Sequence, residues 1–514
     1  MAPGRQKLST GFLLAIILII AAALRLFYFV EIQDNPLPLF MVSSPTFDSH
    51  NFVALAQDIR AHHWLGSYAT GYSPVYSYLI AGVFQIFGVS LNSIFLFQMI
   101  LDLALVYLIF QTTCLLFGEK EIGLLAAFLA ACYGPFLYYE GSILRESVIG
   151  FCNLLSFFLM LKAFKENQKG YFLFAGVGIG LAMALRPGFL IFFLVPYIFF
   201  AVRKSWSARI LSCVIFFLGV MLAIFPFWLR NQMIGAAMIT EKPGPTIFWI
   251  GNTYDADGMG FYVTDTQEKL AAITEGRILK TIQVWYQEIQ RHPREYLSLY
   301  GRKFQMLFNG YEVPSNDSYD LAYKNSTALK MSFVDFKIIA PLALVGLVLI
   351  FRKVSQAGLL YLFLFSLNFL LFVFYVQSRH RLPIIPFYII PAAYTIYYFY
   401  LAIQMRRYKL LVPAMIGVIL VSLFTKPNEA IINQIFHGRI RCMDFSNMAL
   451  AYRYVYENNL NLSDEQKQTI ISKAIKFREK SVINAPQEYQ PFYNSDLNNL
   501  YALREQWLTK VKEN

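Results

Sequence analysis

Long apolar runs separated by short polar turns make up most of the chain, and about eleven of them are long enough, or nearly so, to cross a bilayer. A spanning helix needs about 20 predominantly apolar residues, because the hydrocarbon core is about 30 Å thick. The pattern therefore predicts an all-α polytopic membrane protein. We expect the spans at residues 10–30, 93–117, 122–139, 142–161, 171–185, 188–202, 207–229, 335–351, 357–377, 384–402 and 410–424.

A twelfth run, residues 74–90, contains Pro74, Gly82, Gln85 and Gly88, and it decides the orientation of everything after it. If this run does not cross and the N-terminus is cytoplasmic, the short basic loops all face the cytoplasm, as the positive-inside tendency requires. If it crosses, all of these loops lie outside. We therefore interpret residues 74–90 as a re-entrant or juxtamembrane helix. The basic loop residues are Lys120, Lys162, Lys165, Lys169, Arg203, Lys204, Arg209, Arg352, Lys353, Arg406, Arg407 and Lys409.

This topology places the C-terminus outside and divides the chain into four parts. The parts are a transmembrane module, a large periplasmic loop, C-terminal transmembrane helices and a soluble periplasmic tail, at residues 1–229, 230–334, 335–425 and 426–514. The module contains a first outer loop, residues 31–73. The tail is expected to form short helices, one of which begins at a capping box made by Ser463 and Gln466.

The composition supports a membrane protein, because 57% of the 514 residues are hydrophobic and only 15% are charged. A soluble domain carries about 25% charged residues. Secreted disulfide scaffolds, disordered chains, coiled coils and ordinary cytosolic enzymes are therefore excluded. The net charge of +12 is explained by basic cytoplasmic loops and needs no nucleic-acid partner. The five cysteines show no C-x-x-C spacing, so we expect neither a zinc site nor a disulfide set.

Ionisable residues at the predicted outer membrane surface are candidates for function, because charged groups near hydrocarbon are costly. Two are carboxylates, which can act as a general base or bind a cation. The others are arginines and a histidine, and the planar guanidinium suits phosphate because it donates two parallel hydrogen bonds. Together they indicate chemistry on a phosphorylated lipid. The candidates are Asp48, Glu140, Arg186, Arg379, His380 and Arg381.

Each candidate also has a purely structural interpretation. Asp48 can cap the helix expected at residues 49–59. Arg145 and Glu146 can form an internal pair, and the other arginines can anchor a span end or bind lipid headgroups in general. The D-x-D motif at residues 255–257 lies in a Gly-rich loop, which is typical of a turn rather than of a metal site.

Several stretches, taken in order, resemble the GT-C glycosyltransferases, specifically the branch of protein O-mannosyltransferases and aminoarabinose transferases found in bacteria. The likeness runs from about residue 8 to 402 and includes seven spans before a large outer loop, the number that the loop charges also give. The stretches are SPTFDSHNFVALAQDI at 44–59, YSPVYSYLIAGVFQIFG at 72–88, YGPFLYYEGSILRES at 133–147, GVGIGLAMALRPGFL at 176–190, LRNQMIG at 229–235, TIFWIGNTYDADG at 246–258, HPREYLSLYGRKFQMLFNGYEVPSN at 292–316 and SRHRLPIIPFYIIPAAY at 378–394.

The resemblance implies a transferase that takes a sugar from a polyprenyl-phosphate donor on the outer face of the bacterial inner membrane. The acceptor is a glycan, a lipid or a protein. Asp48 matches the family's catalytic carboxylate, which deprotonates or hydrogen-bonds the acceptor hydroxyl in an inverting reaction. Glu140 matches the second acidic position only by its place in the chain, as an acceptor positioner or a metal ligand. No cofactor is implied, although Glu140 leaves a divalent metal open.

The resemblance also implies where the donor phosphate binds. Arg379 and Arg381 fall where relatives hold the lipid phosphate, whose developing charge they would stabilise. His380 stands where relatives commonly have tyrosine. Arg186 is assigned either to the phosphate or to a span-end anchor.

Two other classes of protein remain open. A secondary transporter would place polar residues and broken helices near the midplane, often in paired halves. Here Asp102 and Asn153 are the conspicuous polar residues inside spans, and no second copy of them is evident. A non-catalytic lipid-binding membrane protein built on the same fold would tolerate the loss of Asp48.

Overall fold

The structure, a computed structural model, is helical throughout the residues that it describes, apart from turns and one isolated bridge between Tyr133 and Val334. This confirms the prediction of an all-α fold. The described residues are 9–188, 190–202, 204–236, 244–260, 264–351, 353–354, 356–427, 439–459, 461–487 and 489–513. Two basic residues used to predict the topology, Arg203 and Arg352, lie outside these ranges.

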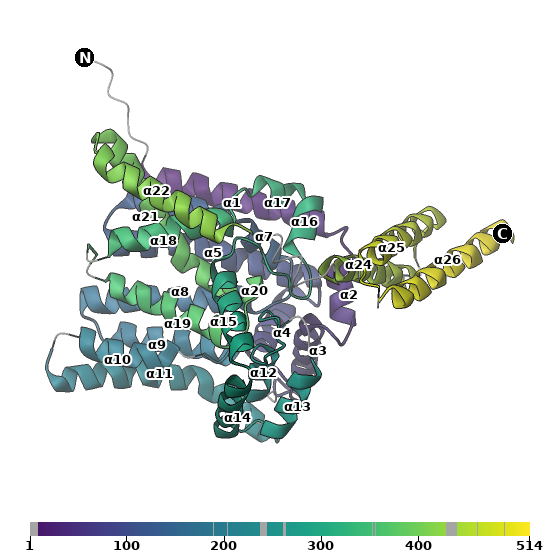
Figure 1. The fold of residues 1–514 in the computed structure, drawn as a ribbon, viewed down its shortest axis with the longest axis horizontal. Helices are drawn as coiled ribbons and strands as arrows, with labels where there is room; N and C mark the ends of the chain where they lie inside the picture. Colours follow the sequence, from purple (N-terminus) through teal and green to yellow (C-terminus); the bar gives the residue numbers. More distant parts are fainter. Residues whose placement is uncertain are drawn as a thin grey trace, which may run out of the picture.

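Eleven apolar helices lie side by side in a bundle, drawn roughly horizontally in Figure 1. They are α1 (Thr10–Ile32), α5 (Leu91–Phe117), α6 (Lys120–Ala131), α8 (Glu146–Glu166), α9 (Gly170–Leu185), α10 (Leu190–Ala201), α11 (Trp206–Met233), α18 (Phe336–Ile350), α19 (Ala357–Val373), α21 (Ile385–Gln404) and α22 (Tyr408–Thr425). Six segments of the described chain are long and apolar enough to cross a membrane. These are α1, α5, α8, α11, α22 and the continuous stretch Ser378–Gln404 that ends in α21.

The remaining helices gather at one end of the bundle, which we call the loop-rich end (Figure 1). The first turn of α1, the C-terminal ends of α10 and α18, and the starts of α11 and α19 lie at the opposite end. The helices of the loop-rich end are α2 (Leu37–Ser43), α3 (Asp48–Ala61), α4 (Val75–Phe87), α7 (Gly134–Glu140), α12 (Gly244–Ile250), α13 (Asp265–Thr274), α14 (Ile278–Arg291), α15 (Pro293–Phe308), α16 (Tyr319–Asn325), α17 (Thr327–Met331), α20 (Ser378–Arg381) with the 3-10 turn η1 (Leu382–Ile384), and the tail helices α24 (Arg439–Asn458), α25 (Asp464–Asn484) and α26 (Gln490–Glu513).

Two apolar runs differ from a simple transmembrane span. The run at residues 122–139 was expected to be one span, but the structure divides it into α6 and α7. The break has a local cause, because Pro135 lies in the first turn of a new helix and Tyr133, the residue before that helix, bridges to Val334. The run at residues 74–90 forms α4, a helix of 13 residues at the loop-rich end.

Helices α9 and α11 approach closely because glycines of each helix face the backbone of the other. A Cβ at Gly176 would lie 2.0 Å from the carbonyl oxygen of Phe216, and one at Gly219 would lie 2.1 Å from that of Leu173. In a lipid environment, where apolar side chains gain little by leaving the solvent, such close backbone packing is a main source of helix association.

In the described part of the tail there are three helices, and the first of them, α24, packs against α2 of the first loop. Their lengths of 20, 21 and 24 residues show that the prediction of short helices is wrong, although the predicted capping box is confirmed at Ser463 and Gln466. Leu37 and Met41 of α2 are buried together with Ala451 of α24. The tail therefore rests on the segment that leads directly to α3.

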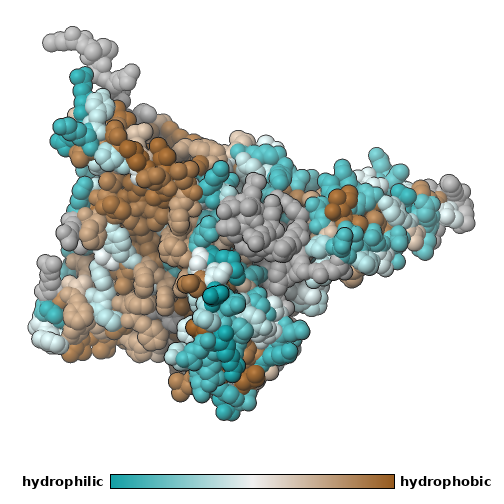
Figure 2. All heavy atoms as spheres, viewed as in Figure 1, coloured by the Kyte–Doolittle hydropathy of each residue, from teal (hydrophilic) through white to brown (hydrophobic). Residues whose placement is uncertain are grey.

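Apolar and hydrophilic side chains on the surface follow the same division between the bundle and the loop-rich end. Figure 2 shows apolar side chains over the face of the bundle and hydrophilic ones over the tail and the α13–α15 region. Exposed apolar residues such as Leu222 of α11 and Leu420 of α22, 54% and 61% exposed, belong to this apolar belt. The distribution fits a polytopic membrane protein with one broad soluble end.

Candidate functional site

Asp48 is the first residue of α3 and lies at the loop-rich end. Its position is fixed by the bonds of its neighbours: the His50 ring contacts the carbonyl oxygen of Val42 at 2.7 Å, and the Ser49 hydroxyl donates to that of Ile143 at 3.3 Å. The Asp48 side chain makes no hydrogen bond to its own helix, so it does not cap α3. Its carboxylate is free to face other elements.

Two side chains from distant parts of the chain hold the Asp48 carboxylate. The Tyr72 hydroxyl donates to Oδ1 at 2.5 Å, and Nη1 of Arg379 donates to Oδ2 at 2.5 Å. The carboxylate is 17% exposed and the guanidinium 12%, so the pair is largely shielded from water. Arg379 belongs to α20, 331 positions away in sequence.

The charge state of Asp48 follows from these contacts. Burial on its own would raise the pKa of Asp48, but Arg379 and the hydrogen bond from Tyr72 outweigh it and lower the pKa to about 2. Burial and the neighbouring carboxylate raise the pKa of Tyr72. At neutral pH the site therefore holds a carboxylate anion that accepts a hydrogen bond from a neutral phenol.

Two further arginines lie beside this pair, and together with Arg379 we call them the arginine cluster. Arg145 lies over the Tyr72 ring at 5.5 Å and donates to the Leu185 carbonyl oxygen at 2.7 Å. Arg186 contacts Oε1 of Glu146 at 2.5 Å. Three guanidinium groups face the carboxylates of Asp48 and Glu146, which leaves one net positive charge. Such a cluster suits an anion with several oxygens.

His380 and Arg186 meet at a narrow cleft between α8, α9, α10 and α19. The cleft has a volume of about 40 Å³, and its walls are mostly aliphatic side chains. Asn153 of α8 and Ser366 of α19 are its polar members farther into the bundle. Arg186 ends α9 at the loop-rich end, so the cleft runs from the arginine cluster into the apolar bundle.

Arg381 does not join the arginine cluster. It contacts Oε2 of Glu312 at 3.0 Å and donates to the Asn309 carbonyl oxygen at 2.8 Å, and its side chain is 2% exposed. Its guanidinium also lies 3.8 Å from the centre of the Phe336 ring. The expectation that Arg381 lies beside Arg379 is corrected for a geometric reason, because neighbouring side chains on the short helix α20 point in different directions.

Glu140 is also placed away from Asp48. Its carboxylate lies 3.0 Å from Nε of Arg25, and Arg25 in turn is ion-paired with Asp102. All three side chains are at most 2% exposed. The expected grouping of Glu140 with the arginines is thus corrected, since the C-terminal residue of α7 turns into the bundle, towards α1 and α5.

Some residues of the site were missed or misread in the sequence. Tyr72 occurs in an aromatic-rich stretch and gives no local signal that its hydroxyl faces a carboxylate. Arg145 and Glu146 were noted as adjacent charges, but Glu146 pairs with Arg186 rather than with its neighbour.

Asp257 of the D-x-D accepts hydrogen bonds from the backbone amides of Met259 and Gly260, which is turn geometry. The described residues contain no group of three or more His, Cys, Asp or Glu side chains that could hold a metal.

Residues 72–229 match the family model described as dolichyl-phosphate-mannose-protein mannosyltransferase. The matched region begins at Tyr72, includes Arg145 and Arg186, and ends with α11. No curated protein matches the chain. The match supports a membrane glycosyltransferase of the GT-C superfamily.

Proposed function

We propose that this membrane glycosyltransferase transfers a sugar from a polyprenyl-phosphate donor to an acceptor hydroxyl, with inversion, at the loop-rich end. We assign that end to the outer face of a bacterial inner membrane. The observation that carries the proposal is the Asp48 carboxylate, held by Tyr72 and Arg379 beside a cluster of arginines. A base and an anion-binding group are thus adjacent, as transfer from a phosphate leaving group requires.

The donor fits the arginine cluster and the cleft next to it. The phosphate is assigned to Arg379, Arg145 and Arg186, with His380 alongside, and the first isoprene units to the aliphatic walls of the cleft. The lipid remains in the apolar bundle while the sugar emerges at the loop-rich end. No nucleotide is needed, because the phosphate is the leaving group itself.

The reaction is a single displacement. The acceptor oxygen attacks the anomeric carbon as its proton passes to Asp48, and the bond from that carbon to the phosphate oxygen breaks. The electron pair leaves with the polyprenyl phosphate, whose added negative charge the arginine cluster stabilises. Attack opposite the leaving group inverts the anomeric configuration.

The resting geometry gives Arg379 a second role. A carboxylate with a pKa of about 2 is a weak base, and Arg379 contributes to that low pKa. When the donor phosphate engages Arg379, the guanidinium shares its charge with the phosphate and Asp48 becomes more basic. The general base is therefore strengthened only when a donor is present, which limits wasteful proton transfer.

We assign Glu140 and Arg381 to the scaffold of this site rather than to its chemistry. The ion pairs of Glu140 with Arg25 and of Arg381 with Glu312 account for both side chains. Each pair ties a loop at this end to the bundle. Removing either ion pair is expected to affect the stability of the protein more than the rate of the chemical step.

The test is the Asp48→Asn variant of the full chain in lipid nanodiscs, assayed with a radiolabelled polyprenyl-phosphate sugar and cell-envelope acceptors. Loss of a general base lowers the rate by about 10²–10⁴-fold. The matched control is Asp265→Asn, which changes an exposed aspartate at the start of α13. Undiminished transfer by a folded Asp48→Asn protein would exclude Asp48 as the base.

A further inference from the structure

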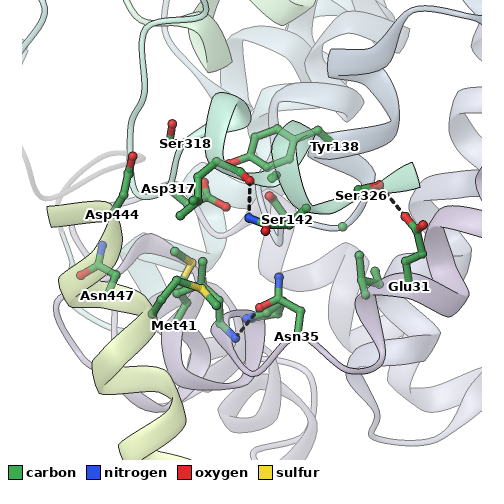
Figure 3. Close-up of a pocket in the computed structure, with 18 of the residues that line it drawn as sticks. Glu31, Asn35, Met41, Tyr138, Ser142, Asp317, Ser318, Ser326, Asp444 and Asn447 are labelled. Atoms are coloured by element: carbon green, nitrogen blue, oxygen red, sulfur yellow. Dashed lines mark hydrogen bonds between the residues drawn. The ribbon is translucent and has the colours of Figure 1, made fainter. Parts of the chain in front are cut away.

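A second cavity at the loop-rich end has a different chemistry from the arginine cluster. Its volume is about 280 Å³, close to the lower limit of about 300 Å³ for small-molecule sites. Figure 3 shows it between the first loop, α7, the segment before α16 and the tail helix α24. It is therefore walled by parts of the chain that are far apart in sequence.

The charges on this wall are all negative among the residues that the structure describes. Four carboxylates and several hydroxyl and amide groups line the cavity, and none of its described lining residues is Lys, Arg or His. The carboxylates are Glu31, Asp34, Asp317 and Asp444. One of these carboxylates already has a partner, because Glu31 accepts a hydrogen bond of 2.8 Å from the backbone amide of Thr327 at the start of α17.

Asp317 is a buried carboxylate of this wall, next to Tyr138. Burial raises its pKa to about 6, although Tyr138 and the more distant charge of Arg379 act in the opposite direction. Beside it, Ser318 also lines the cavity and is 3% exposed, yet its hydroxyl has no hydrogen-bond partner among the described residues. A buried hydroxyl normally has a partner, so an open one in a cavity wall points to a ligand that supplies it.

The same cavity offers an aromatic surface. Tyr452 of α24 and Phe477 of α25 line it, and their rings stack with centroids 5.7 Å apart and planes inclined by 12°. Aromatic side chains next to carboxylates, amides and hydroxyls are a combination that pyranose rings bind.

The cavity also lies next to the proposed base. Ser49, which directly follows Asp48, lines the cavity. Its hydroxyl donates a hydrogen bond to the carbonyl oxygen of Ile143, another lining residue. The cavity therefore adjoins the start of α3, the helix that begins with Asp48. This neighbourhood is where an acceptor for the proposed base would be held.

We infer that this cavity binds the acceptor, and that the acceptor is a sugar carrying a free amine, whose ammonium group bonds to Asp317. The identification of the ligand as an acceptor rests on the proposed function, but binding of that ligand to the cavity does not depend on catalysis. The unpartnered Ser318 hydroxyl takes a hydroxyl of the sugar, and the aromatic wall takes the ring. Because α24 and α25 form that wall, the tail selects the acceptor.

The test measures binding without the donor, on the full chain in nanodiscs, by ligand-observed saturation-transfer NMR. The probes are 6-amino-6-deoxyglucose and glucose at about pH 7.5, where an alkyl ammonium remains charged and a carboxyl with a pKa of about 6 is ionised. These sugars differ in one group. We expect the amine to bind about tenfold more tightly or better, since a hydrogen bond to a charged group contributes about that much.

Variants locate the binding. Asp317→Asn should remove the preference for the amine, while Asp320→Asn, which changes a carboxylate paired with Lys324 outside the cavity, should keep it. Asp48→Asn should bind the amine normally and fail to transfer, which separates this inference from the proposed function. Equal binding of the two sugars, an undisturbed preference in Asp317→Asn, or stronger binding of a lysine peptide than of the amino sugar would each overturn it.

Discussion

Arg379 should set the pH at which the transferase loses activity. The guanidinium keeps the pKa of Asp48 at about 2, so the wild-type protein has an ionised base throughout any practical assay range. A neighbouring arginine lowers an aspartate pKa by about 1–3 units. In Arg379→Gln the Asp48 pKa should therefore rise to about 3–5, because burial then acts with less opposition.

The assay is the pH dependence of kcat/KM, which reports the pKa of the free enzyme's essential base. We expect the wild type to be flat from about pH 4 upward and the variant to lose activity towards acid with a midpoint about 1–3 units higher. Arg277→Gln serves as the control, because Arg277 is an exposed arginine paired with Glu275.

If Arg379→Gln has too little activity for its pH dependence to be measured, Tyr72→Phe is used instead. This change removes one hydrogen bond to Asp48 but keeps the ring that Arg145 lies over. Its acid limb should move in the same direction by a smaller amount. If active Arg379→Gln and Tyr72→Phe proteins both kept the wild-type acid limb, the assignment of Asp48 as a base controlled by Arg379 would be refuted.

Three other predictions test the scaffold. Arg381→Met should lower thermal stability in detergent and leave the donor KM nearly unchanged. The reason is that the buried Glu312 carboxylate loses its partner, at a cost of about 3–5 kcal/mol. A raised donor KM at unchanged stability would instead support a phosphate-binding role for Arg381. Gly219→Val should lower the thermal midpoint strongly by driving α9 and α11 apart, whereas Gly82→Ala, with no neighbouring atom within 4 Å, should not. A cysteine at position 168, Gln168→Cys, should react only with reagents added from the cytoplasm, and labelling from outside would overturn the proposed orientation.

Apolar periodicity was enough to predict most of the bundle. All but one of the predicted runs overlap a single long apolar helix, since a stretch of about 20 apolar residues has few stable alternatives in lipid. The exception at residues 122–139 arises because hydropathy averages over a Gly-Pro step that starts a new helix. Arg25 was overlooked for a related reason, since one charge in a long apolar helix barely changes its mean.

The site was less accessible to sequence reasoning. Asp48 and Arg379 were identified as candidates, but their contact spans 331 positions, and no local spacing encodes it. Glu140 and Arg381 were assigned by residue type and position, whereas their roles depend on the direction in which each side chain leaves its helix. A rotation of about 100° per residue separates neighbours on a helix, so Arg379 can face Asp48 while Arg381 faces Glu312.

The contact between the tail and α2 has a practical consequence for inhibition. Phe40 of α2 packs on Tyr454 of α24 and also on Phe47, the residue before Asp48. A small molecule or antibody fragment that wedges between α2 and α24 would displace the segment carrying the proposed base without touching the cleft that we assign to the lipid. Such an agent would slow turnover at saturating donor, and an excess of the lipid could not relieve it.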